Sequence, residues 1–223
     1  MHEDACGNFE GTISGMRGSE LAQRQGIPRL VQRLKRAMGP AGIFLRGMIE
    51  HPRMVGAIMP SSAQTIRAML APVDWDKCKL FVEYGPGVGT FTLPVLDRLP
   101  RDGELVVIDT NPLFIDYLCK AISDSRFHAV LGSAEDVEEI IVSLGHEKAD
   151  YVLSGIPFTN LPDGVGPAIV QATKRALRKG GAFMTYQYSK SALHLTERYF
   201  THIDTQRVWA NLPPNFLVWG WRD

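Results

Sequence analysis

From about residue 80 onward, short apolar runs alternate with longer amphipathic patterns. The runs consist mainly of Val, Ile, Leu and Phe, and the segments between them repeat apolar residues every three or four positions, as a helix requires. This alternation predicts βαβ units and a parallel sheet that is buried on both faces. We expect strands at residues 79–84, 104–109, 127–131, 149–154 and 181–187, with helices near 90–98, 112–122, 135–144 and 164–178.

The C-terminal segment has a different pattern. Residues 205–210 and 216–222 read as two strands joined by the sequence Asn-Leu-Pro-Pro, which predicts an antiparallel, hairpin-like ending. The expected fold is therefore α/β: a doubly wound, mostly parallel, Rossmann-like sheet that ends in an antiparallel hairpin.

Three regions can be distinguished along the chain. Residues 1–20 are polar and glycine-rich, so we expect them to be disordered. Residues 21–60 contain a predicted helix with an apolar face and a basic face, and residues 61–223 form the α/β domain, beginning with a helix at 63–70 capped by Ser61 or Ser62. The apolar face consists of Ile27, Leu30, Val31, Leu34 and Met38, and the opposite face carries Arg29, Arg33 and Arg36.

Charge is unevenly distributed along a chain that is neutral overall. The 223 residues have a formal net charge of zero, so the whole molecule exerts no long-range attraction on nucleic acid. Residues 21–60, however, contain seven Lys or Arg and one acidic residue.

The N-terminus lacks the apolar core of a signal peptide, and no apolar run reaches the ~18–20 residues that span a bilayer. These features predict a cytoplasmic protein. Its cysteines form no C-x-x-C pair, so no metal site is expected.

The strongest chemical signal is the segment from Glu83 through Gly85, Gly87 and Gly89, which follows the first predicted strand. Glycines at this position allow a tight turn and let a ligand approach the main chain. One strand later, Asp109 stands at a strand end, followed by Thr110. An acid there is placed to accept hydrogen bonds from both ribose hydroxyls of an adenosine.

The spacing of the glycines separates two classes of cofactor. The dinucleotide fingerprint G-x-G-x-x-G requires glycine at position 90, where this chain has Thr90. A dinucleotide also presents a pyrophosphate to a helix N-terminus, whereas S-adenosylmethionine presents an ammonium and a sulfonium. A carboxylate such as Glu83 favours these two cations. We therefore predict S-adenosylmethionine as the cofactor, converted to S-adenosylhomocysteine.

Ser133, Ala134 and Glu135 follow the third predicted strand. At this position a backbone N–H and a short polar side chain suit an adenine ring, but Ser133 or Glu135 suits the first turn of a helix equally well. Both interpretations remain open from the sequence.

A second motif, Ser154-Gly-Ile-Pro-Phe158, follows the fourth predicted strand and so belongs at the same edge of the sheet. It is similar to the N-I-P-Y turn of amine methyltransferases, in which a side-chain oxygen and a backbone carbonyl hold a nitrogen nucleophile. Gly155 replaces the Asn or Asp of that turn, which weakens the case for a planar nucleobase amine. Phe158, together with Tyr186 or Tyr188, instead suits a cationic head group, although ordinary packing accounts for these aromatics as well.

The basic helix allows three interpretations. It suits the plane of an anionic membrane, where each Lys or Arg contributes ~1 kcal/mol. It also suits RNA phosphates, or docking on the domain with its charges in solvent. The candidate membrane-binding residues are Arg29, Arg33, Lys35 and Arg36.

The chain resembles bacterial phospholipid N-methyltransferases of the peripheral type in four runs taken together: FLRGMIEHPRMVGAIMPSS, VEYGPGVGTFT, SGIPF and NLPPNFLVW. The resemblance covers about residues 40–222 and implies stepwise methylation of phosphatidylethanolamine towards phosphatidylcholine. It further implies a catalytic domain at 61–223, cofactor binding by Glu83 and the glycine loop, and membrane contact at the inner face of the cell membrane through the N-terminal helix. Asn215 departs from the small residue, such as Ala, expected at that position.

The resemblance leaves the proton acceptor undetermined. An alkyl ammonium has a pKa of ~10.4 and must lose a proton before it attacks. Tyr188, His51 and Glu50 are the candidates, and Ser154, Pro157 and Phe158 complete the predicted acceptor site. We expect a phospholipid substrate, no nucleic-acid partner and a monomer. The alternatives are an rRNA adenine N6-methyltransferase and a non-catalytic membrane-binding protein that retains the fold.

Overall fold

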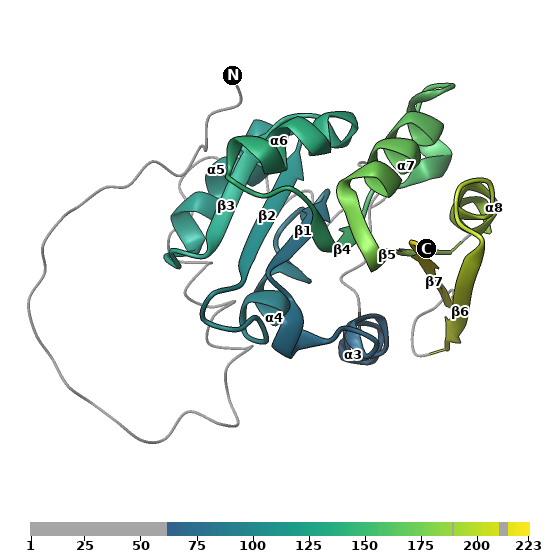
Figure 1. Cartoon of the computed structure of the whole chain (residues 1–223), viewed down its shortest axis with the longest axis horizontal. Coiled ribbons are helices and arrows are strands. Elements are labelled where there is room, and N and C mark those ends of the chain that lie inside the picture. Colours follow the sequence, from purple (N-terminus) through teal and green to yellow (C-terminus); the bar gives the residue numbers. More distant parts are fainter. Residues whose placement is uncertain (1–61, 189, 210–213) are drawn as a thin grey trace, which may run out of the picture. The chain divides into compact units, whose positions relative to one another are not determined.

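The computed structural model of the protein describes residues 62–188, 190–209 and 214–223. The predicted disordered N-terminus and the predicted basic helix lie outside these residues. Within them, the predicted α/β architecture is confirmed (Figure 1).

The described part contains a seven-stranded mixed sheet with strand order β3-β2-β1-β4-β5-β7-β6. The first five strands along the chain pair in parallel, and β7 pairs antiparallel with both β5 and β6. The strands are β1 (Leu80–Tyr84), β2 (Glu104–Asp109), β3 (Phe127–Leu131), β4 (Ala149–Ser154), β5 (Leu177–Gln187), β6 (His202–Val208) and β7 (Asn215–Trp221).

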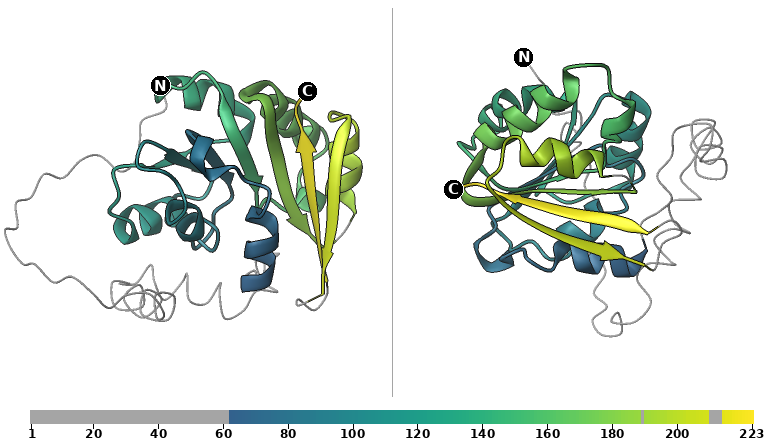
Figure 2. Two further views of the ribbon diagram at one scale, coloured as in Figure 1. Left: turned by 60° about the horizontal axis from the view of Figure 1, so that its bottom comes forward. Right: turned by 90° about the vertical axis from the view of Figure 1, so that its right-hand side faces the viewer.

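Helices cover both faces of this sheet (Figure 2). They are α3 (Ala63–Leu70), α4 (Thr92–Leu96), α5 (Pro112–Ala121), α6 (Val137–Ser143), α7 (Val165–Ala176) and α8 (Ser191–Glu197), with short 3₁₀ turns η2 (Trp75–Lys77), η3 (Ala134–Asp136) and η4 (Phe158–Asn160). Val82 on one face joins a core with Ile140 of α6 and Val170 of α7. Side chains alternate along a strand, so the neighbouring Glu83 points to the other face, where it meets Thr92 of α4. The doubly wound arrangement follows from this division.

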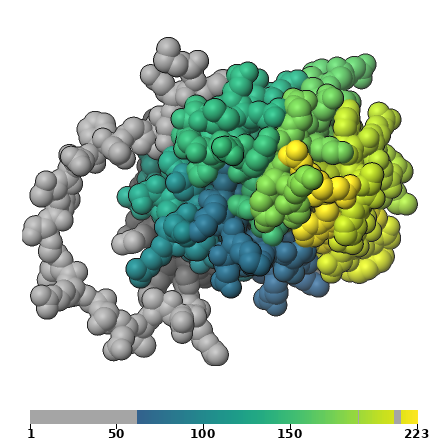
Figure 3. Space-filling model, in the orientation of Figure 1, coloured from purple at the N-terminus to yellow at the C-terminus, as the bar shows by residue number. Residues whose placement is uncertain are grey.

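The predicted hairpin ending is confirmed, but the structure adds an element to it. β7 returns between β5 and β6, so the last strand of the chain lies inside the sheet rather than at its edge. Helix α8 was not predicted, and β5 begins at Leu177, four residues before the predicted start at 181. Figure 3 shows these C-terminal elements, in green and yellow, along one side of the described part.

Helix α3 anchors the start of the described chain against β7. Ser62 caps the helix by accepting a hydrogen bond from the Thr65 amide at 3.2 Å, which confirms the predicted cap. The indole of Trp219 donates to the Met69 carbonyl at 3.0 Å, and the amide of Asn215, which is 2% exposed, donates to the Thr65 hydroxyl at 3.5 Å. The side chain of Asn215 therefore makes a hydrogen bond that a small residue at this position could not make.

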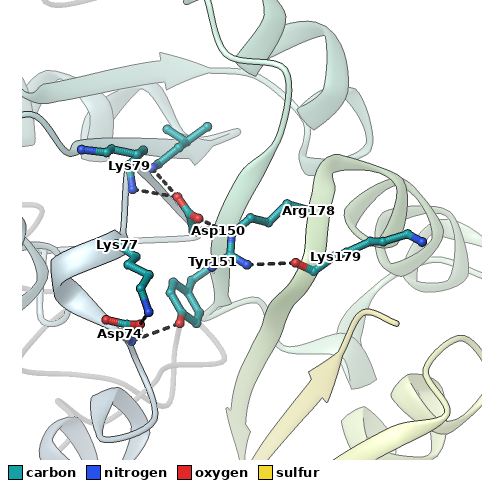
Figure 4. A network of polar contacts seen from close by, with 8 residues as sticks. Asp74, Lys77, Lys79, Asp150, Tyr151, Arg178 and Lys179 are labelled. Carbon is teal, nitrogen blue, oxygen red and sulfur yellow. Dashed lines mark hydrogen bonds and ion pairs between the residues drawn. The ribbon is translucent and has the colours of Figure 1, made fainter.

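A polar network joins β1, β4 and β5 at the end of the sheet where these strands begin (Figure 4). One carboxylate oxygen of Asp150, a residue that is 6% exposed, accepts the backbone amides of Lys79 and Leu80 at 2.7 and 2.9 Å. Its other oxygen pairs with Arg178 of β5. Nearby, the hydroxyl of Tyr151 accepts the Asp74 amide at 3.0 Å. This network lies opposite the ends where the predicted site residues stand.

Candidate functional site

The glycine loop follows β1 directly and is held in place by neighbouring strands. Gly85, Gly87 and Gly89 have φ angles of 62°, 55° and 82°, a region that side chains other than glycine rarely adopt. The Gly85 amide donates to the Ile108 carbonyl of β2 at 2.9 Å, and the Gly89 amide donates to the Pro86 carbonyl at 2.9 Å. The three glycines are therefore needed for the turn itself, whatever the loop binds.

Glu83 lies beneath this loop and is 3% exposed. The hydroxyl of Thr92, at the start of α4, donates to its carboxylate at 2.7 Å. Burial raises the pKa of Glu83 to about 7, because a carboxylate loses hydration there; the Thr92 hydrogen bond opposes the rise, and the nearby charge of Asp109 adds to it. A buried acid with a pKa near neutrality is well suited to a cationic ligand.

Asp109 ends β2 next to the glycine loop. Its carboxylate accepts the Asn111 amide at 2.8 Å, and burial raises its pKa, while hydrogen bonds from the amides of Asn111, Gly87 and Thr110 act in the opposite direction. Thr110 is exposed, and Asn111 caps α5 by accepting the Leu113 amide at 3.0 Å. Glu83 and Asp109 thus lie at adjacent strand ends on either side of the loop.

Ser133 caps the 3₁₀ turn η3, and its hydroxyl accepts the Glu135 amide at 3.2 Å. The helix-cap interpretation of Ser133 is therefore confirmed. Ala134 is 5% exposed and packs in the core with Val137, whereas Glu135 is exposed. The Gly132 amide donates to the Asp109 carbonyl at 3.0 Å, so this turn adjoins the end of β2.

The second motif, Ser154–Phe158, packs directly on the glycine loop. The Gly155 amide donates to the Tyr84 carbonyl at 2.8 Å. A Cβ atom at Gly155 would lie 2.8 Å from the Gly85 carbonyl oxygen, closer than real Cβ contacts. This contact explains why the chain has glycine where related turns have Asn or Asp. Ser154 is fully buried, and its hydroxyl accepts the Ile156 amide at 3.3 Å, which places it inside the turn.

The three candidate aromatic residues lie in different surroundings. Phe158 packs against Phe183 in an edge-on contact at 6.3 Å, on the face that α7 covers. Tyr186 packs on Phe91 with ring centroids 4.7 Å apart, on the face that α4 covers. Tyr188 is 43% exposed. The structure therefore directs Phe158 and Tyr186 to opposite faces.

Some residues at this edge of the sheet were not identified from the sequence. Thr92 holds Glu83, Phe91 supports Tyr186, and the Gln187 side chain donates to the Ile156 carbonyl at 2.8 Å. A polar residue at the start of the helix after a glycine loop is a candidate hydrogen-bond partner for the acid before the loop. The position of Thr92 in the sequence therefore indicates this contact. The contacts of Phe91 and Gln187 depend on tertiary structure alone.

Several predicted residues lie outside the described part of the chain: Glu50, His51, Arg29, Arg33, Lys35 and Arg36. Among the residues that the structure describes, no helix is long and apolar enough to cross a membrane. The same residues contain no cluster of three or more His, Cys, Asp or Glu arranged to hold a metal ion.

Comparisons with known proteins place this geometry in context. Over 178 residues the chain is 26% identical to an ornithine lipid N-methyltransferase from Singulisphaera acidiphila, an alignment that covers 77% of this chain and 91% of that protein. No protein-family profile matches the chain.

Solved structures show the same fold at low sequence identity. A precorrin-6y C5,15-methyltransferase from Geobacter metallireducens has a TM-score of 0.58 and 14% identity, with 73% of this chain and 89% of that chain covered. Human methyltransferase-like protein 13 in complex with S-adenosylhomocysteine has a TM-score of 0.56 and 14% identity, with 73% of this chain and 83% of that chain covered. The chain therefore shares the fold of these methyltransferases, and one of them binds S-adenosylhomocysteine, the product of the cofactor that the sequence predicted.

Proposed function

We propose that the protein transfers a methyl group from S-adenosylmethionine to the primary alkyl amine of a membrane-lipid head group. The observation that carries this proposal is the similarity to an ornithine lipid N-methyltransferase along 91% of that protein. The acceptor turn supports it, because Gly155 presents no carboxamide or carboxylate side chain with which to hold a planar nucleobase amine.

Two lipids carry the required amine. Phosphatidylethanolamine is the first candidate, because the sequence motifs resemble phospholipid N-methyltransferases that act on it and its mono- and dimethylated forms. Ornithine lipid is the second, because the similar protein bears its name. Both present a primary alkyl ammonium at the end of a flexible chain, so one acceptor site suits either.

In this proposal the two acids at the sheet edge have separate roles. Glu83 faces the cationic methionine part of the cofactor, and Asp109 accepts hydrogen bonds from the ribose hydroxyls. The turn at Ser133, Ala134 and Glu135 borders the adenine. The buried position of Glu83 supports its role, since burial disfavours the carboxylate and a nearby cation would stabilise it.

The cofactor supplies a methyl group already activated by the positive sulfonium. The amine nitrogen forms its bond to this carbon with its lone pair as the carbon–sulfur bond breaks, and the bonding electrons remain on sulfur. The amine must first lose a proton to Tyr188, His51, Glu50 or water. The contribution of the protein is then mainly to hold the two reactants in line.

Membrane contact is assigned to residues 21–60, at the inner face of the cell membrane. The excess of Lys and Arg in this region suits anionic lipid, and the apolar face of its predicted helix suits the acyl boundary. The lipid head group is then presented to a protein that needs no membrane-spanning segment to reach it.

A radiolabelled methyl-transfer assay tests the proposal. The protein is incubated with labelled cofactor and phosphatidylglycerol vesicles that contain either phosphatidylethanolamine or ornithine lipid, beside parallel reactions with RNA. We expect label in one or both lipids and none in RNA. Label in RNA alone would contradict the proposal, and the absence of any label despite cofactor binding would favour a non-catalytic membrane-binding protein.

A further inference from the structure

The acceptor turn lacks the side chain that usually holds a nitrogen nucleophile, and the space beside it is already filled. Around the position where a Cβ of residue 155 would lie, the structure places the Gly85 carbonyl oxygen at 2.8 Å, the Tyr186 hydroxyl at 3.0 Å and the Tyr84 carbonyl oxygen at 3.4 Å. The hydroxyl of Tyr186 thus lies 3.0 Å from the point where an Asn or Asp side chain at residue 155 would begin.

Tyr186 reaches this position from a different strand and is supported there. It stands near the end of β5, and its ring packs on Phe91, which is 1% exposed and immediately precedes α4. A ring held on one side by a buried aromatic residue loses little further freedom when a substrate binds. The hydroxyl is therefore presented to the glycine loop by a rigid support.

The next residue of β5 acts on the same turn. The Gln187 side-chain amide donates to the Ile156 carbonyl at 2.8 Å, which fixes the Ile156–Pro157 peptide of the turn. A carbonyl oxygen has a second lone pair, so this contact leaves it able to accept another hydrogen bond. The end of β5 thus contributes two adjacent polar groups to the acceptor turn.

We propose that the Tyr186 hydroxyl oxygen takes the place of the missing side chain at Gly155 and accepts a hydrogen bond from an N–H of the alkyl amine, with Gln187 positioning the turn. The inference rests on the proposed function and names the residue that selects a flexible alkyl amine in that site. Because the oxygen accepts an N–H, the nitrogen lone pair stays free to attack the methyl carbon.

This arrangement has a consequence for successive methylations. A primary amine has two N–H bonds, a monomethylated amine has one, and a dimethylated amine has none once it is neutral and ready to attack. Tyr186 therefore assists the first two transfers and makes no such hydrogen bond in the third. Damage to the fold would affect all three transfers alike.

The test compares the wild-type protein with Tyr186→Phe on three lipids in phosphatidylglycerol vesicles: phosphatidylethanolamine and its monomethyl and dimethyl forms. We expect kcat/KM to fall about tenfold on the first two, the size of effect that one lost hydrogen bond gives, and to stay within about twofold on the third. Cofactor affinity, measured by isothermal titration, should remain unchanged. Tyr199→Phe, two residues after the end of α8 and partly buried against the core, serves as the matched control and should leave all rates unchanged.

Other outcomes separate this inference from the proposed function. Equal losses on all three lipids, or unchanged kcat/KM on phosphatidylethanolamine, would overturn the role of Tyr186 while lipid methylation stands. If the wild type uses phosphatidylethanolamine alone, a loss of kcat/KM with unchanged cofactor affinity supports the inference, and a loss of both overturns it. A wild type that methylates no lipid would refute the proposed function, and the inference with it.

Discussion

In the proposed function, Glu83 combines a cost to folding stability with a benefit to cofactor binding. Its carboxyl group is 3% exposed and its pKa is raised to about 7, chiefly by burial, so the free protein holds it partly protonated near neutral pH. The cationic cofactor favours the carboxylate form. Residues of this kind, which weaken the empty protein and strengthen the complex, are typical of functional sites.

Replacing Glu83 with Gln tests both sides of this balance. The folded pKa of about 7 lies above the ordinary value of 4.5, so the folded state binds more protons in between and the free energy of unfolding falls as the pH rises from 4.5 to about 7. Glu83→Gln removes this pH-dependent fall in the free energy of unfolding. Above about pH 7, and without cofactor, the variant should therefore be more stable than the wild type by about 3 kcal/mol. The two proteins should converge near pH 4.5.

Chemical denaturation at several pH values measures this difference, and isothermal titration measures cofactor binding. We expect Glu83→Gln to lose at least about tenfold in affinity, because the neutral amide gives no charge to the ammonium and sulfonium. A variant that is less stable than the wild type at about pH 8, or that binds the cofactor equally well, would contradict this account of Glu83.

Gly155 is required by contact rather than by backbone conformation. A Cβ there would lie 2.8 Å from the Gly85 carbonyl oxygen, so Gly155→Ala should push the acceptor turn and the glycine loop apart. We expect weaker cofactor binding as well as slower methyl transfer, each by about tenfold or more. Gly145→Ala is the control, because a Cβ at Gly145 meets nothing within 4 Å and its positive φ affects stability alone. Unchanged cofactor affinity in Gly155→Ala would show that the contact is not needed.

At the level of elements, β5 runs from the Asp150 network at one end of the sheet to the predicted site at the other end. Its second residue, Arg178, pairs with Asp150, and its last two residues, Tyr186 and Gln187, lie beside the acceptor turn. The insertion of β7 beside β5 fixes this strand from the other side. Helix α8 connects β5 to β6. Thr196 of this helix and Phe200, which follows it, pack against β7 where Gly220 has no side chain.

The Asp150 network should contribute strongly to stability. Asp150→Ala leaves two backbone amides, those of Lys79 and Leu80, and the Arg178 guanidinium without their acceptor, in a place where Asp150 itself is 6% exposed. We expect a loss of about 2–4 kcal/mol in the free energy of unfolding, measured by urea denaturation. Lys77→Ala removes an exposed contact to Asp74 in the same region and should leave the midpoint unchanged. Equal effects from the two variants would show that Asp150 has no special role.

For the molecule as a whole, the proposed function assigns membrane contact and chemistry to segments of different charge. The chain has 24 basic and 24 acidic residues, yet residues 21–60 carry seven of the basic residues and one of the acidic residues. Residues 61–223 contain 16 basic and 19 acidic residues, so in the proposed function the basic segment, and not the catalytic domain, provides the attraction to anionic lipid.

Changing Arg29, Arg33 and Arg36 together to Glu reverses the charge of the predicted basic face. We expect the variant to be lost from phosphatidylglycerol vesicles in co-sedimentation. It should retain cofactor affinity, because the acids and glycines of the proposed site lie on β1, on β2 and in the loop after β1. Wild-type binding should also weaken at high salt. Undiminished co-sedimentation of the variant would mean that the basic face does not contact the membrane.

The sequence by itself determined the order of strands and helices along the chain, the glycine loop with its two acids and the nature of the cofactor. These depend on local patterns: alternating burial, positive φ angles that need glycine, and an acid at a strand end. Helix α8 and the first residues of β5 were missed because short segments carry weak patterns.

Only the tertiary structure decided the place of β7 between β5 and β6, the burial of Glu83 against Thr92 and the packing of Gly155 on the glycine loop. It also separated Phe158 from Tyr186, which the sequence had grouped by type alone. These features arise from contacts between segments far apart in the chain, where strand pairing and close packing fix distances that no local pattern of residues contains.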